Sequence, residues 1–325
     1  MTVVVLGIDA LDPDLVDPDE HPSLTLEGHK RINTINSASG EPSTHELWPT
    51  IITGLPPKKH GLELEDGVAW ENPFLRVGSS IANILVPDEI QTRIGAWLLN
   101  NTDQDAFRVE SSYYSENGID TVFDGRDASP IGIPNYVTDP DSEDREHQLR
   151  RSLGNLFERD LNTESGHVSS DPEAFYELCM EMAMIRIARV RRALRSQEYE
   201  LVFGYTSGLD LIGHVAFDRP SMQMAVYEEL DQFVSELRGD LTDDDVLILV
   251  SDHGLQDGVH THEAMVATTH PETIEPITGV ESVRDGIEYA LNDSNHEPTG
   301  RQFEQKRSRE QSEQVKSQLE DLGYI

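Results

Sequence analysis

Three uninterrupted apolar runs constrain the fold of this 325-residue chain more than any other feature of its sequence. They are VVVLGI at residues 3–8, ELVFGYT at 200–206 and DVLILV at 245–250. Apolar and β-branched residues without polar alternation indicate strands that are buried on both faces, as in a parallel sheet. Between the runs, Asp171-Pro172 and Arg219-Pro220 each place a proline at the first position of a predicted helix. Strands that alternate with helices predict an α/β fold, with a mostly parallel central sheet flanked by helices.

The pattern along the chain predicts a core with one insertion and a tail. We expect residues 1–66 and 168–295 to form the core. Residues 67–167 contain clusters of Gly, Pro, Asn and acidic residues with little strand pattern, so we interpret them as an inserted cap or lid. Residues 296–325 are highly charged and are expected to form a C-terminal helix or tail.

The charge balance excludes some classes of partner. Asp and Glu total 61 against 25 Lys and Arg, which gives a formal net charge of −36. A protein that coats nucleic acid neutralises phosphates with basic residues, and anionic membrane surfaces attract the same residues, so we expect neither partner. Only five of the basic residues are Lys. An acidic surface that is poor in Lys suits molar salt, where self-repulsion is screened, so we predict a halophilic source.

The location of the protein is also predicted from its N-terminus. Met1 and Thr2 lead straight into the first apolar run, so we expect no signal peptide and a cytoplasmic location. The apolar runs are far shorter than the roughly 20 residues that span a bilayer, so we expect no membrane segment. The oligomeric state stays open.

Acidic residues follow all three predicted strands. Asp9 ends the first run, Asp210 comes shortly after the second, and Asp252 follows the third. Because ligands bind at the carboxyl ends of strands in open α/β sheets, these three carboxylates are expected to meet there. They would repel one another unless a cation neutralised them.

Histidines accompany these acids. His214 is four residues after Asp210, and His253 directly follows Asp252. His260 and His262 lie within ten residues of that pair. Mixed Asp and His ligands favour zinc or manganese over magnesium or calcium. Each of these acids or histidines alone also fits an ordinary helix cap or a solvated histidine. Their combination, in this order and at the strand ends, is more specific for a metal site.

Hydroxyl groups precede a predicted helix in STHELWPTIITGLPPKKHG, residues 43–61. Ser43 and Thr44 are ordinary N-cap candidates, and the helix is expected to end at Gly54. A hydroxyl next to a metal site is also a nucleophile candidate, because a cation lowers its pKa.

These motifs together resemble the alkaline phosphatase superfamily, and within it the phosphodiesterase/nucleotide pyrophosphatase branch. The resemblance lies in VVVLGID, in STHELWPTIITGLPPKKHG, in GLDLIGH, and in SDHG followed by VHTHEA. It implies an alkaline-phosphatase-like sheet with a variable cap, and two divalent metal ions, Zn²⁺ or Mn²⁺. It also implies hydrolysis of a small phosphoester such as a nucleotide.

The resemblance assigns roles residue by residue. Thr44 matches the nucleophile, with Ser43 as the alternative, and His260 matches the last metal ligand, with His262 as the alternative. The implied metal ligands are Asp9, Thr44, Asp210, His214, Asp252, His253 and His260.

One departure leaves the substrate open. Relatives of this branch often carry Phe-Pro-Asn after the nucleophile, whereas His45 and Glu46 follow Thr44 here. His45 is either a substitute phosphate donor or a surface histidine. A phosphomonoesterase or phosphomutase-like enzyme is therefore an alternative, as is a non-phosphoryl metallohydrolase. A regulatory protein that binds metal or phosphate without turnover is the alternative from another class.

Overall fold

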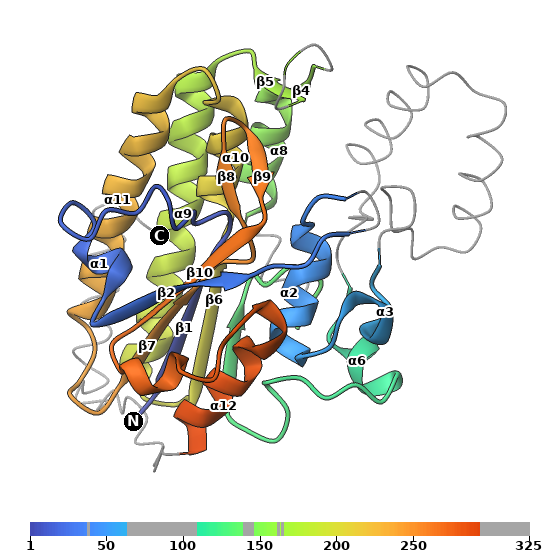
Figure 1. The fold of residues 1–325 in the computed structure, drawn as a ribbon, viewed down its shortest axis with the longest axis vertical. Helices are drawn as coiled ribbons and strands as arrows, with labels where there is room; N and C mark the ends of the chain where they lie inside the picture. The colour runs from blue at the N-terminus through green and yellow to red at the C-terminus, as the bar shows by residue number, and fades with distance from the viewer. Residues whose placement is uncertain (38–39, 64–108, 139–145, 161–162, 164–165, 293–325) are drawn as a thin grey trace, which may run out of the picture.

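The computed structural model describes residues 1–37, 40–63, 109–138, 146–160, 163 and 166–292 (Figure 1). Its centre is a six-stranded sheet with the order β2-β10-β7-β1-β6-β3. The strands are β1 (Val3–Ile8), β2 (Gly28–Asn33), β3 (Ala128–Ile131), β6 (Leu201–Thr206), β7 (Val246–Val250) and β10 (Glu263–Thr268). β1 pairs in parallel with β6 and β7, and β3 pairs in parallel with β6. Only β10 runs against its neighbours β7 and β2, so the predicted mostly parallel sheet is confirmed.

Helices cover both faces of this sheet, as the sequence predicted (Figure 1). One face carries α9 (Pro172–Ser196), α10 (Gly208–Val215) and α11 (Pro220–Arg238), with the shorter α1 (Pro22–Thr25) and α8 (His147–Leu156) beside them. The opposite face carries α2 (Thr44–Thr53), α3 (Pro57–His60), α6 (Ser112–Glu116) and α12 (Val283–Asn292). The 3₁₀ turns η1 (Pro271–Ile274) and η2 (Val280–Ser282) adjoin this second layer.

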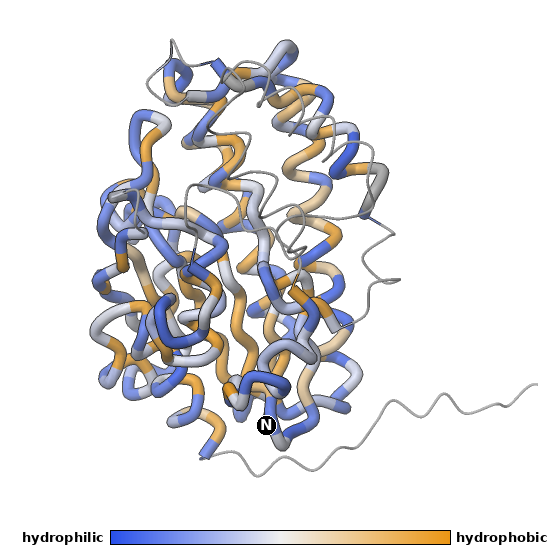
Figure 2. Tube along the Cα trace, turned by 90° about the vertical axis from the view of Figure 1, so that its right-hand side faces the viewer, coloured by the Kyte–Doolittle hydropathy of each residue, from blue (hydrophilic) through white to orange (hydrophobic). Residues whose placement is uncertain are grey.

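The core lies on both sides of the central strands. All six residues of β1 are fully buried, with Val4 and Leu6 facing the α9 layer and Val3 and Val5 facing the α2 layer. This alternation follows from the two-residue period of a strand. Figure 2 shows the hydrophobic stretches concentrated in the strands and in the inward parts of the helices.

Local signals explain where the helices begin and end. The Asp171 side chain accepts a hydrogen bond from the backbone N–H of Ala174 at 3.1 Å, which caps α9 directly before the proline at its first position. α2 ends at Gly54, whose φ of 69° is left-handed and therefore favours glycine. α2 also packs closely on β1: a Cβ added at Gly7 would lie 2.3 Å from the Trp48 ring.

Part of the expected 67–167 insertion belongs to the central sheet. Residues 128–131 form β3, and Val122 and Phe123 pack in the α2-side core. The sequence did not reveal this strand because it has only four residues, ASPI, with a proline that an edge strand tolerates. The remainder of the expected cap up to residue 108, and the expected 296–325 helix or tail, lie outside the described residues.

Two short hairpins complete the described structure. β4 (Phe157–Arg159) pairs with β5 (His167–Ser169), and β8 (Gly254–Gln256) pairs with β9 (Val259–Thr261). Among the described residues, no helix combines the length and apolar character needed to cross a membrane.

Candidate metal centre

The site lies at the carboxyl edge of the central sheet, where neighbouring parallel strands end. Asp9 directly follows β1, and Asp252 comes two residues after β7. Asp210 lies in the first turn of α10, which begins shortly after β6. Because β6, β1 and β7 are adjacent and parallel, their ends meet and bring the three acids together, as predicted.

Three of the predicted ligands form one cluster, which we call the buried cluster: Asp9, Asp252 and His253. Their potential ligand atoms lie within 4.8 Å of one another. His253 Nε2 is 3.4 Å from Asp9 Oδ1 and 3.4 Å from Asp252 Oδ2. All three residues are at most 1% exposed, so two carboxylates and an imidazole share a buried site.

Thr44 meets this cluster at the N-terminus of α2. Its Oγ1 is 3.1 Å from His253 Nε2 and 3.3 Å from Asp9 Oδ1. Ser43 occupies the N-cap, where its backbone carbonyl accepts the first helical hydrogen bonds from Glu46 and Leu47. Of the two candidate hydroxyls, the structure therefore places that of Thr44 beside the buried cluster.

The other three predicted ligands form what we call the outer cluster: Asp210, His214 and His260. Asp210 Oδ1 is 3.4 Å from His214 Nε2 and 3.3 Å from His260 Nε2. The helix α10 places the first pair on one face, because they are four residues apart. His260 enters from β9, whereas the alternative His262 is exposed and lies 2.8 Å from Asn36 Oδ1 through its Nδ1.

The three imidazoles present the same nitrogen to the site. Nδ1 lies next to a backbone carbonyl in each: 2.9 Å from Gly258 for His214, 3.0 Å from Pro42 for His260, and 3.1 Å from Gly254 for His253. A carbonyl can only accept, so each Nδ1 carries a proton and each neutral ring turns an Nε2 lone pair inward. Ligand histidines in metal sites are held in this way.

These atoms are poorly satisfied without a cation. The Nε2 atoms of His214 and His260 are 3.0 Å apart, so two lone pairs would face each other unless a proton or a metal ion lay between them. Asp210 Oδ1 and Asp252 Oδ2 are buried without a hydrogen-bond partner. Buried unpaired carboxylate oxygens are costly, and both clusters therefore fit a divalent cation.

The pKa shifts of the site residues also fit a bound cation. Burial raises the pKa of the Asp9 carboxyl well above its ordinary value, and the nearby charges of Asp252 and Asp210 add to that shift. Burial also raises the pKa of Asp252 to about 6. Burial opposes protonation of His260, but the adjacent Asp210 carboxylate raises its pKa to about 9. The site thus favours added positive charge.

Some residues of the site carried no sequence signal. Tyr205 is buried in β6, and its hydroxyl donates a hydrogen bond to Asp9 Oδ2. Trp48 packs edge-on against the Tyr205 ring, with centroids 4.9 Å apart. The Thr34 hydroxyl donates to the backbone carbonyl of Asp252 at 2.6 Å. Such contacts depend on the tertiary structure, so no spacing in the sequence could have indicated them.

His45 is not the surface histidine that the sequence left open. Its side chain is half-buried, and burial lowers the pKa of the imidazole to about 4. The ring is therefore neutral at physiological pH.

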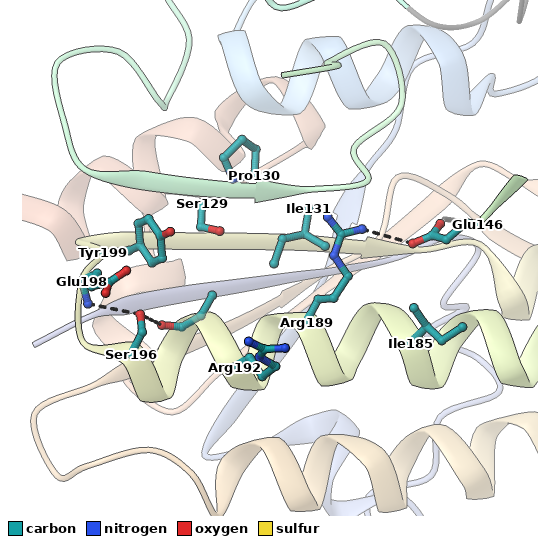
Figure 3. A pocket seen from close by; sticks show the side chains of 11 residues that line it. Ser129, Pro130, Ile131, Glu146, Ile185, Arg189, Arg192, Ser196, Glu198 and Tyr199 are labelled. Atoms are coloured by element: carbon teal, nitrogen blue, oxygen red, sulfur yellow. Dashed lines mark hydrogen bonds and ion pairs between the residues drawn. The ribbon is translucent and has the colours of Figure 1, made fainter. Parts of the chain in front are cut away.

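A separate hollow lies away from the two clusters (Figure 3). It is an open depression of about 580 Å³ along β3 and the C-terminal half of α9. Arg189 is 3.1 Å from Glu146 Oε1, and the same carboxylate also pairs with Arg186 at 2.5 Å. None of the predicted site residues lines this hollow.

The profile of the type I phosphodiesterase / nucleotide pyrophosphatase family matches residues 3–322. No curated protein matches the sequence.

Among solved structures, the chain is similar to a protein from Pyrococcus horikoshii, with a TM-score of 0.44, 12% identity, and coverage of 90% of this chain and 97% of that one. It is similar to alkaline phosphatase from the Antarctic bacterium TAB5, with a TM-score of 0.43, 13% identity, and coverage of 90% and 97%. It is also similar to murine ectonucleotide pyrophosphatase/phosphodiesterase 5, with a TM-score of 0.40 and 14% identity. That match covers 78% of this chain and 57% of the murine chain.

Proposed function

The chain belongs to the type I phosphodiesterase / nucleotide pyrophosphatase family, and we propose that it hydrolyses small phosphodiesters such as nucleotides, with Thr44 as nucleophile. The observation that carries this proposal is the position of Thr44. Its hydroxyl is within 3.3 Å of both Asp9 and His253, at the start of a helix and beside the buried cluster of metal-ligand type. Ser43 occupies the N-cap, so the Thr44 hydroxyl does not cap the helix and lies instead beside the buried Asp9 carboxylate.

We further propose that the two clusters hold two divalent cations, Zn²⁺ or Mn²⁺. Asp9, Asp252, His253 and Thr44 would bind one, and Asp210, His214 and His260 would bind the other. Cations held there would offset the negative charge of the phosphoryl oxygens and favour loss of the Thr44 proton.

The residues of the chain then define the steps. The Thr44 oxygen attacks phosphorus in line, while the bond from phosphorus to the leaving oxygen breaks. The leaving oxygen departs as an alcohol with the proton lost from Thr44, and the phosphoryl group on Thr44 keeps the other ester of the substrate. Water then breaks the bond from phosphorus to the Thr44 oxygen, which releases a phosphomonoester and regenerates the hydroxyl. The Thr44 hydroxyl donates its one proton to Asp9 Oδ1 and lies 3.1 Å from His253 Nε2, and Tyr205 orients Asp9 through its second carboxylate oxygen.

A comparison of two chromogenic substrates tests the proposed reaction. Hydrolysis of bis-p-nitrophenyl phosphate and of p-nitrophenyl phosphate would be measured in molar KCl with zinc or manganese, and again after chelation. We expect faster turnover of the diester and loss of both activities with chelator. Faster turnover of the monoester would contradict the diesterase proposal in favour of a phosphatase or mutase-like enzyme. If folded, metal-loaded protein hydrolysed neither substrate, the proposal that it is a general phosphoester hydrolase would be contradicted.

A further inference from the structure

The helix that carries Thr44 contains a proline. α2 runs from Thr44 to Thr53, and Pro49 lies inside it. In a regular α-helix the N–H of residue 49 would donate to the carbonyl of residue 45. Proline has no N–H, and its ring crowds that carbonyl. The carbonyl of His45, one residue after the proposed nucleophile, therefore lacks its regular helical donor.

A side chain from another part of the chain supplies a donor to this carbonyl. Asn135 Nδ2 donates to the His45 carbonyl at 2.9 Å. Asn135 comes four residues after the end of β3, in the loop at the same carboxyl edge of the sheet as the two clusters. The hydrogen bond thus ties the first turn of α2 to the sheet edge that carries the acids.

The surroundings of Asn135 hold its amide in place. The residue is 5% exposed, and its φ of 55° is left-handed, a conformation that asparagine tolerates better than most residues. Its backbone carbonyl accepts a hydrogen bond from the buried Tyr114 hydroxyl at 2.7 Å. Because the His45 carbonyl can only accept, the NH₂ group must face it, and Oδ1 is left buried without a hydrogen-bond partner. An unpaired buried oxygen costs free energy, and the fold accepts this cost at Asn135 Oδ1 while it keeps the hydrogen bond to the His45 carbonyl.

We propose that Asn135 is a positioning residue for Thr44: it replaces the hydrogen bond that Pro49 removes and so fixes the turn that presents the Thr44 hydroxyl to Asp9 and His253. This inference rests on the proposed function, in which Thr44 is the nucleophile. With the helical bond absent, a contact with the sheet edge sets the direction of this turn. A nucleophile displaced by a fraction of an ångström is misaligned for in-line attack.

A double-mutant cycle tests the pairing of these two positions. Asn135→Gly removes the amide without strain at the left-handed φ, and Pro49→Ala restores an N–H that can donate to the His45 carbonyl. Wild type, both single variants and the double variant would be compared in kcat, KM, metal content and urea midpoint. Asn117→Gly is the matched control, because Asn117 Nδ2 also donates to a backbone carbonyl, that of Tyr113 at 2.8 Å, but at an exposed position.

We expect Asn135→Gly to lower kcat by about ten- to a hundredfold with KM and metal content little changed. In the Pro49→Ala background the same substitution should cost less than about threefold. The urea midpoints should show the same coupling, and Asn117→Gly should keep wild-type kcat. Full kcat in Asn135→Gly, or an equal loss in both backgrounds, would overturn the proposal.

Two further outcomes are also decisive. If Asn135→Gly alone does not fold, we expect the double variant with Pro49→Ala to fold. A double variant that also does not fold would overturn the proposal. If wild type hydrolyses no phosphoester, the proposed function fails. The urea midpoints then still test the Asn135–His45 contact, because additive changes would contradict it.

Discussion

At the residue scale, each cluster draws its acids and imidazoles from a different set of elements. The buried cluster combines the ends of β1 and β7, and the outer cluster combines α10 with β9. Asp210 Oδ1 lies within 3.4 Å of both outer imidazoles and has no hydrogen-bond partner of its own. Loss of this carboxylate should therefore empty one cluster and spare the other.

Titration of metal into Asp210→Asn tests this independence. We expect the wild type to bind two equivalents of Zn²⁺ or Mn²⁺ and the variant to bind one, since a neutral amide is a poor ligand. Asp218→Asn, an exposed acid with 63% of its side chain accessible, is the control and should still bind two. Two tightly bound equivalents in Asp210→Asn would show that Asp210 is not a ligand.

His60 should make stability depend on pH. It is fully buried, its Nδ1 accepts from the N–H of Leu62, and its Nε2 contacts Thr50 Oγ1 at 3.1 Å. Burial lowers the pKa of this imidazole to about 4, from an ordinary value of 6.5. The unfolded chain therefore takes up a proton first, so the contribution is complete above about pH 6.5 and is lost as the pH falls toward 4.

The measurement is the free energy of unfolding between pH 7 and pH 4. Relative to His60→Gln, which does not titrate, wild type should lose up to about 3 kcal/mol over this interval. His29→Gln, at an exposed position, should follow the wild-type curve. Parallel curves for wild type and His60→Gln would contradict the prediction.

The sequence indicated most of the acids because they follow strands whose apolar runs are unmistakable. Asp9 and Asp252 are examples, since a buried parallel strand must end at the ligand edge. The pairing of His260 with Asp210 depended on the family resemblance, because no spacing relates a hairpin residue to a helix fifty positions earlier. Tyr205 and Asn135 were missed, since each acts through a contact that only the folded chain creates.

At the element scale, the β8–β9 hairpin must be docked for His260 to reach the outer cluster. The Asp12 carboxylate, 1% exposed, accepts hydrogen bonds from Thr261 Oγ1 at 3.0 Å and from Gln256 Nε2 at 3.2 Å. It thus links both strands of the hairpin to the loop that follows β1. A Cβ at Gly254 would lie 2.3 Å from Asp12 Oδ2, which shows how closely the hairpin packs on this carboxylate.

Asp12→Ala should therefore lower the metal affinity of the outer cluster, although Asp12 is not one of the proposed ligands. We expect the affinity of the outer cluster for its metal to fall about ten- to a hundredfold, as for other residues that orient metal ligands. Competition with a chelating dye measures this affinity. Asp14→Ala is the control, since Asp14 also accepts from Gln256, at 3.3 Å, but its side chain is 52% exposed. Unchanged metal affinity in folded Asp12→Ala would contradict this account of the hairpin.

Elements with strong periodic or apolar patterns were predictable, and short ones were not. β1, β6, β7, α9 and α11 appear where the sequence placed them. β3 was assigned to the insertion because four residues around a proline give no strand pattern. Its place in the sheet is set by pairing with β6, a long-range contact that local sequence does not encode.

At the scale of the whole molecule, the net charge of −36 opposes folding in dilute solution. Ion pairs such as those of Arg191 with Glu236 and Asp240 neutralise a small part of the acidic surface. At molar salt the Debye length falls to roughly 3 Å, which screens the remaining repulsion. The fold is therefore expected to need salt, in keeping with the proposed halophilic source.

Thermal unfolding in 0.1 M and 2 M KCl tests the salt requirement. We expect the melting temperature to rise by about 10 °C or more at high salt, because many small repulsions are screened together. Sucrose at equal osmolality should reproduce little of this rise, since it leaves the charges unscreened. Equal melting temperatures at both salt concentrations would contradict the proposed adaptation.

The central claim is that Thr44 becomes covalently phosphorylated during turnover. Its most direct test is rapid acid quenching of metal-loaded protein with a diester substrate, followed by mass spectrometry of the peptides. We predict an adduct on Thr44 that consists of the phosphoryl group with the remaining ester of the substrate, its absence in Thr44→Ala, and a fall in kcat of about a thousandfold or more in that variant with metal still bound. Normal turnover in Thr44→Ala, with no adduct on the wild-type residue, would contradict this claim.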